Sequence, residues 1–380
     1  MFQNFLSARK NIKEYDRLSS DFKEIVFYSE SKTYWDYFVN IINELNNSHK
    51  KRITFLTSDY NDFAFNYSNK NLKVLYIGDG ILRTIFLRRI DAKVIVMTMP
   101  DLDSFHIKRS INKVKYIYLF HSLVSTHMVY RKGAFDSYDE IFCSGPHHKR
   151  ELRVIENHYN LKRKKISKVG YPRLDSQLSY VQNCQIKKNV FPTVIIAPSW
   201  GDNGLLEKYS VELLTTLANY EYDVIIRPHP QTLRIHKDIF QSLNQFCIEN
   251  ERFSIDLDIS SYESFNKSDI MISDWSGAAL EFSLAFYKPV IFIDVDKKIN
   301  NIDYASYEIE PLEIFIRDKI GKILKKDNIF NINIFIEDLL AFNKKDFKVL
   351  IDSIRREVVY NEGKSHIIAA KRLVSILSEI

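Results

Sequence analysis

The feature that most constrains the fold is a repeated alternation of short, β-branched apolar runs with longer amphipathic stretches. In the first half the apolar runs lie at 24–28, 53–57, 74–77, 94–97, 116–120 and 140–143. In the second half they lie at 193–197, 223–226, 253–255, 269–272 and 290–293. Stretches that suit helices lie between them, at 34–45, 81–89, 211–219, 233–249 and 278–286. This alternation predicts parallel strands joined by helices, with both faces of each sheet covered.

The chain length and an interruption in this pattern predict two domains. The chain has 380 residues, which fits two domains of roughly 150–200 residues better than one core. A polar segment at 176–189 is interpreted as a linker or as the last helix of the first domain. The expected division is a Rossmann-like domain at 1–180, a second at 190–325, and a tail at 326–380.

The end of the chain has a different character. The strand pattern fades after Asp296, and residues 311–380 are expected to be largely helical, most clearly at 344–359 and 364–380. By analogy with known two-domain α/β proteins, such a tail packs on the domains or crosses between them.

Composition and charge narrow the class of partner. Hydrophobic residues make up 45% and charged residues 27% of the chain, a globular balance. The formal net charge of +6 is spread along the chain. It suits an anionic small molecule, an anionic polymer or a lipid surface, and it does not argue for nucleic acid. The densest basic run, at 162–165, is either a solvated loop or a contact for anionic lipid or polymer.

Cysteine usage and hydropathy bear on the compartment. The three cysteines, Cys143, Cys184 and Cys247, are far apart and form no CxxC pair. This argues against a disulfide framework and a structural zinc site, so a cytoplasmic location is expected. No signal-peptide pattern and no run of about 18 apolar residues occurs. Work on a membrane-bound acceptor would then take place from the membrane surface.

The most informative motif is a small polar turn between the strand at 269–272 and the helix at 278–286. Its residues are Ser273, Asp274, Trp275, Ser276 and Gly277. Hydroxyls and backbone N–H groups in such a turn lie at a helix N-terminus, whose partial positive charge favours a phosphate. Glu281 follows further along the helix, where a carboxylate can bind ribose hydroxyls. The alternative is a plain helix cap by serine or aspartate.

A second polar turn follows the strand at 223–226. Two prolines fix the directions of Arg227 and His229. A cation beside an imidazole suits a diphosphate, or charge that develops during phosphoryl transfer. The alternative is an ordinary surface histidine.

A third turn follows the strand at 193–197 and contains Pro198, Ser199 and Trp200. The small serine allows a ligand to approach, and the indole offers a stacking surface. An ordinary turn with one aromatic anchor is the alternative.

The first half offers a candidate general base. His121 follows the strand at 116–120 directly, and the carboxyl end of a parallel strand is well placed to face an interdomain cleft. A histidine there can accept a proton from an attacking hydroxyl at neutral pH. His127 competes for this role, and a histidine held by hydrogen bonds within the loop is the third possibility. Arg173 either reaches the cleft or holds the hinge through Asp175, and the sequence leaves these two equal.

Taken in order, these motifs resemble the CDP-glycerol glycerophosphotransferases of teichoic-acid and capsule synthesis. The matching pieces are His121, Gly170-Tyr171-Pro172-Arg173-Leu174-Asp175, Ala197-Pro198-Ser199-Trp200, Arg227-Pro228-His229-Pro230 and Ser273-Asp274-Trp275-Ser276. They cover roughly residues 115–295. The sequence departs from the family pattern at Ser122, where members usually have glycine, and at Gly277, where a second hydroxyl residue is common.

The resemblance implies a GT-B fold, with two Rossmann-like domains whose parallel sheets face an interdomain cleft. It implies transfer of glycerol phosphate or a related polyol phosphate from a CDP-linked donor, with release of CMP. The acceptor would be a hydroxyl of a cell-surface polysaccharide or a lipid-linked glycan. No metal or cofactor is expected, and peripheral contact with the inner face of the membrane is a hypothesis.

The expected mechanism is an in-line displacement, in which positioning and electrostatics do most of the work. Ser273, Ser276 and the helix start hold phosphate, and Glu281 holds ribose. His121 takes the acceptor proton, while Arg227 and His229 stabilise the leaving side. One alternative is a GT-B glycosyltransferase or nucleotide-sugar epimerase that uses a UDP- or CMP-sugar. Another is a non-catalytic nucleotide-sugar sensor or assembly subunit.

Overall fold

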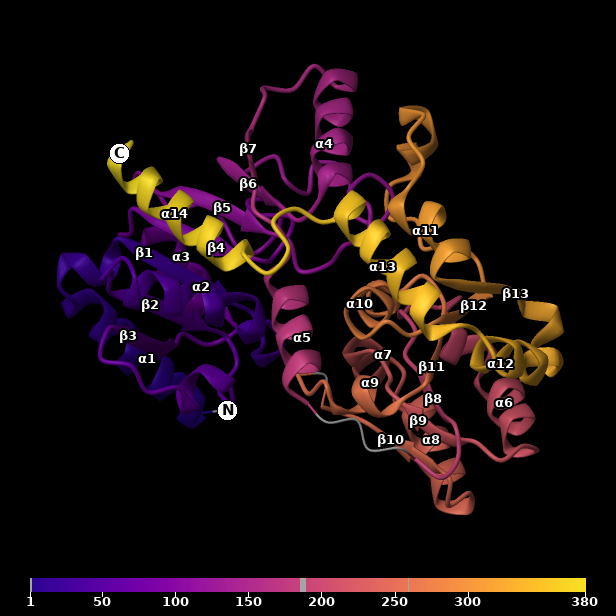
Figure 1. Ribbon diagram of the computed structural model, residues 1–380. Coiled ribbons are helices and arrows are strands. Elements are labelled where there is room, and N and C mark those ends of the chain that lie inside the picture. The colour runs from indigo at the N-terminus through magenta and orange to yellow at the C-terminus, as the bar shows by residue number, and fades with distance from the viewer. Residues whose placement is uncertain (1, 185–188, 259) are drawn as a thin grey trace. The chain divides into compact units, whose positions relative to one another are not determined.

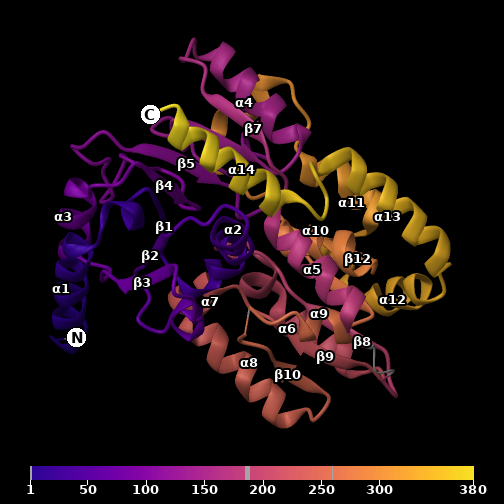
Figure 2. The same ribbon diagram turned by 60° about the vertical axis from the view of Figure 1, so that its left-hand side comes forward.

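The computed structural model describes residues 2–184, 189–258 and 260–380, and the chain divides into two compact units (Figures 1 and 2). The first unit contains the residues up to His121, together with Tyr130–Ser176 and Val358–Ile380. The second contains Ser122–Val129 and Gln177–Glu357. The unit boundary therefore falls directly after His121, and the short segment Ser122–Val129 belongs to the second unit.

The first unit is built on a seven-stranded parallel sheet of order β3-β2-β1-β4-β5-β6-β7 (Figure 1). Its strands are β1 (Ile25–Ser29), β2 (Ile53–Thr57), β3 (Leu72–Tyr76), β4 (Val94–Met97), β5 (Lys115–Leu119), β6 (Glu140–Cys143) and β7 (Lys165–Lys168). Its helices are α1 (Phe2–Arg17), α2 (Trp35–Asn47), α3 (Ile81–Arg89), α4 (Pro146–His158), the start of α5 (Pro172–Asn183), and α14 (Ser365–Ser378). Every residue of β1 and β2 is buried, as expected for parallel strands covered on both faces.

The second unit repeats this topology with a six-stranded parallel sheet of order β10-β9-β8-β11-β12-β13. Its strands are β8 (Thr193–Ile196), β9 (Asp223–Ile226), β10 (Phe253–Ile255), β11 (Ile270–Ser273), β12 (Val290–Asp294) and β13 (Gly321–Lys325). Its helices are α6 (Leu205–Ala218), α7 (Pro230–Ile235), α8 (Lys237–Glu249), α9 (Glu263–Lys267), α10 (Gly277–Phe286), α11 (Leu312–Ile320), α12 (Ile332–Leu340) and α13 (Lys344–Val358). Counted from its first strand, each sheet contains the order 3-2-1-4-5-6 of a doubly wound fold, and the first sheet adds β7 as a seventh strand at its edge.

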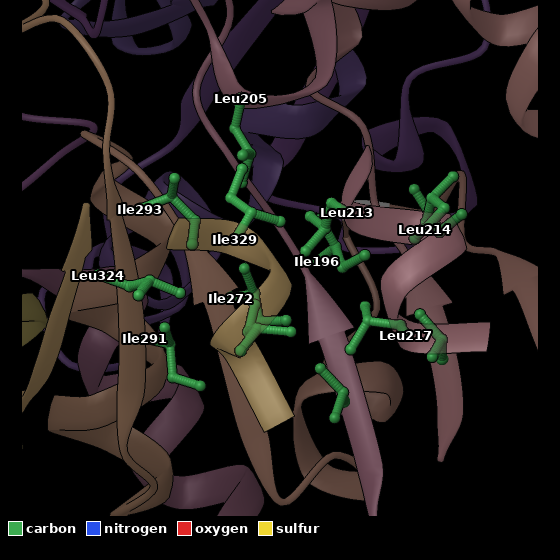
Figure 3. Close-up of a cluster of buried hydrophobic side chains, with 14 of the residues drawn as sticks. Ile196, Leu205, Leu213, Leu214, Leu217, Ile272, Ile291, Ile293, Leu324 and Ile329 are labelled. Carbon is green, nitrogen blue, oxygen red and sulfur yellow. The ribbon is translucent and has the colours of Figure 1, made fainter. Parts of the chain in front are cut away.

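A continuous aliphatic core holds the second sheet to its helices (Figure 3). Ile196, Ile272 and Ile291 come from three neighbouring strands, and Leu213 and Leu217 come from α6. All five side chains are fully buried. Burial of an aliphatic side chain contributes about 1.5–3 kcal/mol. This core therefore fixes the strand ends, from which the polar turns extend.

The predicted alternation is confirmed, and most predicted elements agree with the structure within two residues at each end. The predicted helix at 233–249 is two helices, α7 and α8, which meet at His236 in a non-helical conformation. The polar segment at 176–189 begins as the end of α5, and residues 185–188 of it lie outside the described residues.

Residues 311–380 are largely helical, as expected, but the sequence pattern missed one strand in this range. β13 pairs in parallel with β12 at the edge of the second sheet. Only Leu324 of its five residues is buried, so the strand lacks the apolar run that marked the others. The edge strand β7 and the polar helix α1 were not predicted either, because both lack a clear apolar run.

The C-terminal part of the chain is divided between the two units. α13 lies in the second unit up to Glu357, and α14 lies in the first. Asp175 accepts hydrogen bonds from the backbone N–H groups of Gly363 (2.7 Å) and Ser365 (2.9 Å), at the start of α14. Within the part of the chain that the structure describes, no helix combines the length and the apolar character needed to span a bilayer.

Candidate functional site

The polar turn after β11 directs its first two side chains into the protein. Ser273 Oγ donates to the carbonyl of Ala197 at 2.8 Å. Asp274 accepts from the backbone N–H groups of Ser199 at 2.7 Å and Leu205 at 3.2 Å. Both side chains are buried, with 0% and 1% exposed. They therefore join the carboxyl ends of β11 and β8 and the start of α6 into one rigid assembly.

Trp275 is also turned inward. Its Nε1–H donates to the carbonyl of Val295 at 2.9 Å. The guanidinium carbon of Arg317 lies 3.9 Å from the centroid of a Trp275 ring, and Arg317 pairs with Asp294 at 3.1 Å. Burial lowers the pKa of Arg317, and the hydrogen bond that Arg317 donates to Asp294 opposes that shift. Arg317 was not anticipated from the sequence, because it comes from α11, far along the chain from the turn.

The last two residues of the turn form the start of α10. Ser276 is the N-cap, and its Oγ accepts from the backbone N–H of Ala278 at 3.2 Å. Ser276 and Gly277 are only partly buried, unlike the three residues before them. The positive end of the α10 dipole and its first backbone N–H groups are thus the part of the turn to which the sequence assigns a phosphate, and this assignment stays a prediction.

Glu281 lies one helical turn beyond Gly277, on the same face of α10. Its side chain is 6% exposed, and its Oε2 accepts from Gln177 Nε2 at 2.8 Å. Gln177 is itself fully buried, so it fixes the position of the carboxylate. No motif in the sequence pointed to Gln177, which lies 104 positions from its partner.

The two predicted residues of the turn after β9, Arg227 and His229, have different surroundings. Arg227 is 5% exposed and donates to Ser264 Oγ at 2.8 Å and to the carbonyl of Asp258 at 3.0 Å. Asp256 lies 3.4 Å from the guanidinium. These bonds favour a scaffolding role for Arg227, and direct contact with a phosphate stays a prediction.

His229 is half-exposed and caps α7. Its Nδ1 accepts from the backbone N–H of Gln231 at 3.1 Å. An acceptor role at Nδ1 places the ring proton on Nε2. Donation from Nε2–H of His229 to an oxyanion stays a prediction.

An aromatic and cationic cluster surrounds the turn after β8. The rings of Trp200 and His229 lie 6.0 Å apart, and Lys298 Nζ lies 4.2 Å from a Trp200 ring centroid. Burial lowers the pKa of Lys298 to about 8, while the nearby carboxylates of Asp274 and Glu207 raise it. Pro198 and Ser199 are buried in the turn beneath. Lys298 was missed because it lies in the loop after β12, where the sequence has no motif.

In the first unit, His121 lies two residues beyond the end of β5 and is half-exposed. Its carbonyl accepts hydrogen bonds from Tyr37 at 2.9 Å and Tyr171 at 3.1 Å. Its Nδ1 lies 3.3 Å from the hydroxyl of Tyr118. Burial raises the pKa of Tyr118 well above its ordinary value, so this phenol stays protonated. The backbone and the ring of His121 are therefore both oriented by tyrosines.

His127 has a different environment. It is fully buried, and its Nε2 donates to the carbonyl of Ile309 at 3.0 Å. Nearby, Ser125 donates through its N–H (2.9 Å) and its hydroxyl (2.7 Å) to Glu313. This geometry favours the loop-holding role for His127 over the role of base.

Arg173 and Asp175 hold different parts of the first unit. Arg173 pairs with Asp36 at 3.2 Å and is 7% exposed, in the first turn of α5. Just before it, Gly170 has a φ of 105°, in the left-handed region that glycine tolerates. A side chain there would collide with the carbonyl of Tyr360. The backbone at Gly170 therefore packs closely against Tyr360, in the C-terminal part of the first unit.

The predicted residues consequently fall into two groups, each within one unit. Those of the second unit are Pro198, Ser199, Trp200, Arg227, His229, Ser273, Asp274, Trp275, Ser276, Gly277 and Glu281, together with His127. Those of the first unit are His121 and Arg173.

A comparison with protein-family models decides the family. Residues 14–307 match the model described as CDP-Glycerol:Poly(glycerophosphate) glycerophosphotransferase. The chain belongs to this family. A curated relative is the minor teichoic acid biosynthesis protein GgaB of Bacillus subtilis (strain 168), which is 23% identical over 229 residues. The match covers 55% of this chain and 24% of GgaB, so the chain spans about a quarter of that relative's length.

Solved structures show the same fold. The wall teichoic acid polymerase TagF, in a form soaked with CDPG, has a TM-score of 0.59 and 16% identity, covering 100% of this chain and 98% of that one. The UDP-GlcNAc 2-epimerase of Neisseria meningitidis, bound to UDP-GlcNAc, has a TM-score of 0.63 and 10% identity, covering 93% and 100%. The family member therefore has a GT-B fold, as the sequence predicts.

Proposed function

We propose that this family member transfers glycerol phosphate, or a related polyol phosphate, from a CDP-linked donor to a hydroxyl of a polymeric acceptor, and releases CMP. The observation that carries the proposal is the buried carboxylate of Asp274. It fixes the turns after β8 and β11 together and leaves the N-terminus of α10 as a rigid anion site. Membership of a CDP-glycerol family supplies the donor class.

In the proposal the second unit holds the donor. The first backbone N–H groups of α10 and the Ser276 turn bind a phosphate. His229 Nε2–H and Lys298 then bind the diphosphate from the other side of the Trp200 turn, because both lie beside that indole. Glu281, held by Gln177, binds a ribose hydroxyl. Rigid donors of this kind stabilise charge without having to reorganise during the reaction.

The first unit contributes the base and is the proposed acceptor side. An acceptor oxygen attacks the phosphorus that carries the polyol, and a new P–O bond forms as the bond to the CMP oxygen breaks. His121 Nε2 takes the acceptor proton. This role requires the tautomer in which Nδ1–H points to Tyr118, and the neutral phenol can accept that bond.

The acceptor polymer and its location belong to the same proposal. We place the reaction in the cytoplasm, at the inner face of the membrane, with an anionic or lipid-linked glycan as acceptor. Of the basic run at 162–165, Lys164 pairs with Asp136 at 3.2 Å and Lys165 pairs with Glu379 at 3.0 Å. The run is thus partly neutralised. If the charges at 162–165 were removed and the protein still cofractionated with membranes to the same extent, a membrane role for this run would be excluded.

A donor panel tests the proposal. The chain is incubated with CDP-glycerol, CDP-ribitol and UDP-sugars, with a phosphoglycerol acceptor and without it, and the released nucleotide is measured. Acceptor-dependent CMP release is expected. UDP release would instead indicate a glycosyltransferase or epimerase, and nucleotide binding without turnover would indicate a sensor or assembly subunit.

A further inference from the structure

Ser122 and Gly277 come from distant parts of the chain and lie against each other. Ser122 belongs to the second unit, although it follows His121 directly. A Cβ atom added at Gly277 would collide with the Ser122 hydroxyl, and it would lie 3.6 Å from Val124 Cγ1. The space that a side chain at position 277 would occupy is therefore filled by the hydroxyl of Ser122.

Contact with Ser122, and not backbone conformation, is what disfavours a side chain at position 277. Gly277 has a negative φ within the first turn of α10, which any residue can adopt. Serine would even be the better helix former at such a position. Its Cβ would nevertheless require the Ser122 side chain, or the loop that carries it, to move. The two residues are thus a matched pair.

The Ser122 hydroxyl lies at the end of α10 that the proposed function assigns to phosphate. It accepts a hydrogen bond from the backbone N–H of Val124 at 3.4 Å. A hydroxyl that accepts one bond still carries a proton to donate. Donation to an ionised phosphate gives a strong, short hydrogen bond.

We infer that Ser122 supplies, from the other side of the turn, the phosphate-binding hydroxyl that Gly277 lacks. The inference rests on the proposed function, because it assumes a donor phosphate at the start of α10. It makes Ser122 a donor-binding residue that is covalently next to the proposed base. It also predicts that the hydroxyl can be exchanged between positions 122 and 277.

A swap experiment tests the inference. Ser122→Ala, Ser122→Gly, Gly277→Ser and the double variant Ser122→Gly/Gly277→Ser are compared with the wild type for melting temperature and for donor KM and kcat. Ser122→Ala keeps the Cβ and should raise donor KM about tenfold, with kcat changed little. Gly277→Ser should lower the melting temperature by about 4 °C and raise donor KM. The double variant should recover most of both losses.

Gly80→Ser is the matched control. Gly80 is the N-cap of α3, and a Cβ added there meets nothing within 4 Å. This variant should behave as the wild type. An unchanged KM in Ser122→Ala, or losses in the double variant equal to the sum of the single losses, would overturn the inference. Absence of CMP release by the wild type would instead overturn the proposed function, and the pairing would then be tested by melting temperature and CDP affinity in the same variants.

Discussion

At the end of β11 the side chains of Ser273 and Asp274 are buried and bonded to a neighbouring strand end, whereas beyond the end of β5 the ring of His121 is half-exposed. The two sheets share one strand order, so this difference does not come from topology. In the second unit these polar side chains bond to backbone groups of neighbouring segments and build a scaffold. In the first unit, tyrosines orient the backbone and the ring of His121. The motif side chains thus have different surroundings in the two units, and the proposed roles follow from that difference.

The largest effect should come from His121, the side chain that the first unit presents. His121→Asn should lower kcat about 10²–10⁴-fold, the usual range for loss of a general base, while CDP affinity stays within about twofold. Steady-state CMP release and calorimetric CDP titration measure the two quantities.

His127→Gln is the matched histidine control. Because His127 is buried and bonded to Ile309, its loss should cost about 1–3 kcal/mol of stability but leave kcat per folded molecule nearly unchanged. If His127→Gln abolished turnover in a folded protein while His121→Asn did not, the roles of the two histidines would be reversed.

The second effect tests the scaffold of the second unit. Asp274→Ala leaves two buried backbone N–H groups, those of Ser199 and Leu205, without their acceptor. The free energy of unfolding of this unit should fall by about 2–4 kcal/mol, and donor KM should rise. Urea denaturation measures the first quantity. Full stability with lost activity would show that Asp274 contacts the substrate and is not a scaffold residue.

The third effect concerns Glu281. Glu281→Gln should weaken CDP binding about tenfold, because a charge-assisted bond to a ribose hydroxyl becomes a neutral one. Titrations with CDP and with 2′- and 3′-deoxy-CDP separate the hydroxyls. One of the deoxy ligands should bind the variant and the wild type alike. Equal losses for all three ligands would place Glu281 away from the ribose.

The smallest effect is a pH dependence. Lys298, with a pKa of about 8, is mainly charged below pH 8 and neutral above it. Donor KM should therefore rise a few-fold as pH passes from 7 to 9, and Lys298→Met should remove most of that rise. The folded-state pKa lies below the ordinary value for lysine, so the unfolded chain binds more protons between the two values. Loss of this buried charge should then slightly raise stability as pH increases above about 8. A pH profile identical in wild type and variant would exclude Lys298 from the donor site.

The sequence predicted both sheets and the polar turns, because buried parallel strands leave strong apolar runs and the turns follow them directly. It could not predict β13, whose exposed edge position requires little apolar character. Nor could the sequence predict which side chains contact each site residue. Gln177 beside Glu281, Arg317 beneath Trp275, and Lys298 over Trp200 come from distant elements, and only the folded chain brings them together.

The direction of a side chain was the other quantity that the sequence could not supply. The turn at 273–277 was correctly expected to start a helix. Its sequence did not show, however, that the Ser273 hydroxyl would donate to the carbonyl of Ala197 and point away from the start of the helix. Similarly, His121 and His127 are six positions apart in one loop, and the burial and hydrogen-bond partners that distinguish them are known only from the folded chain.

The most direct test of the central claim follows the phosphorus atom itself. CDP-glycerol and a phosphoglycerol acceptor are mixed with the wild-type chain or with His121→Asn, and the reaction is followed by ³¹P NMR. A new phosphodiester signal should grow in step with CMP in the wild type and be nearly absent in the variant, although the variant still binds CDP. CMP release without a new phosphodiester, or equal phosphodiester formation by both proteins, would contradict it.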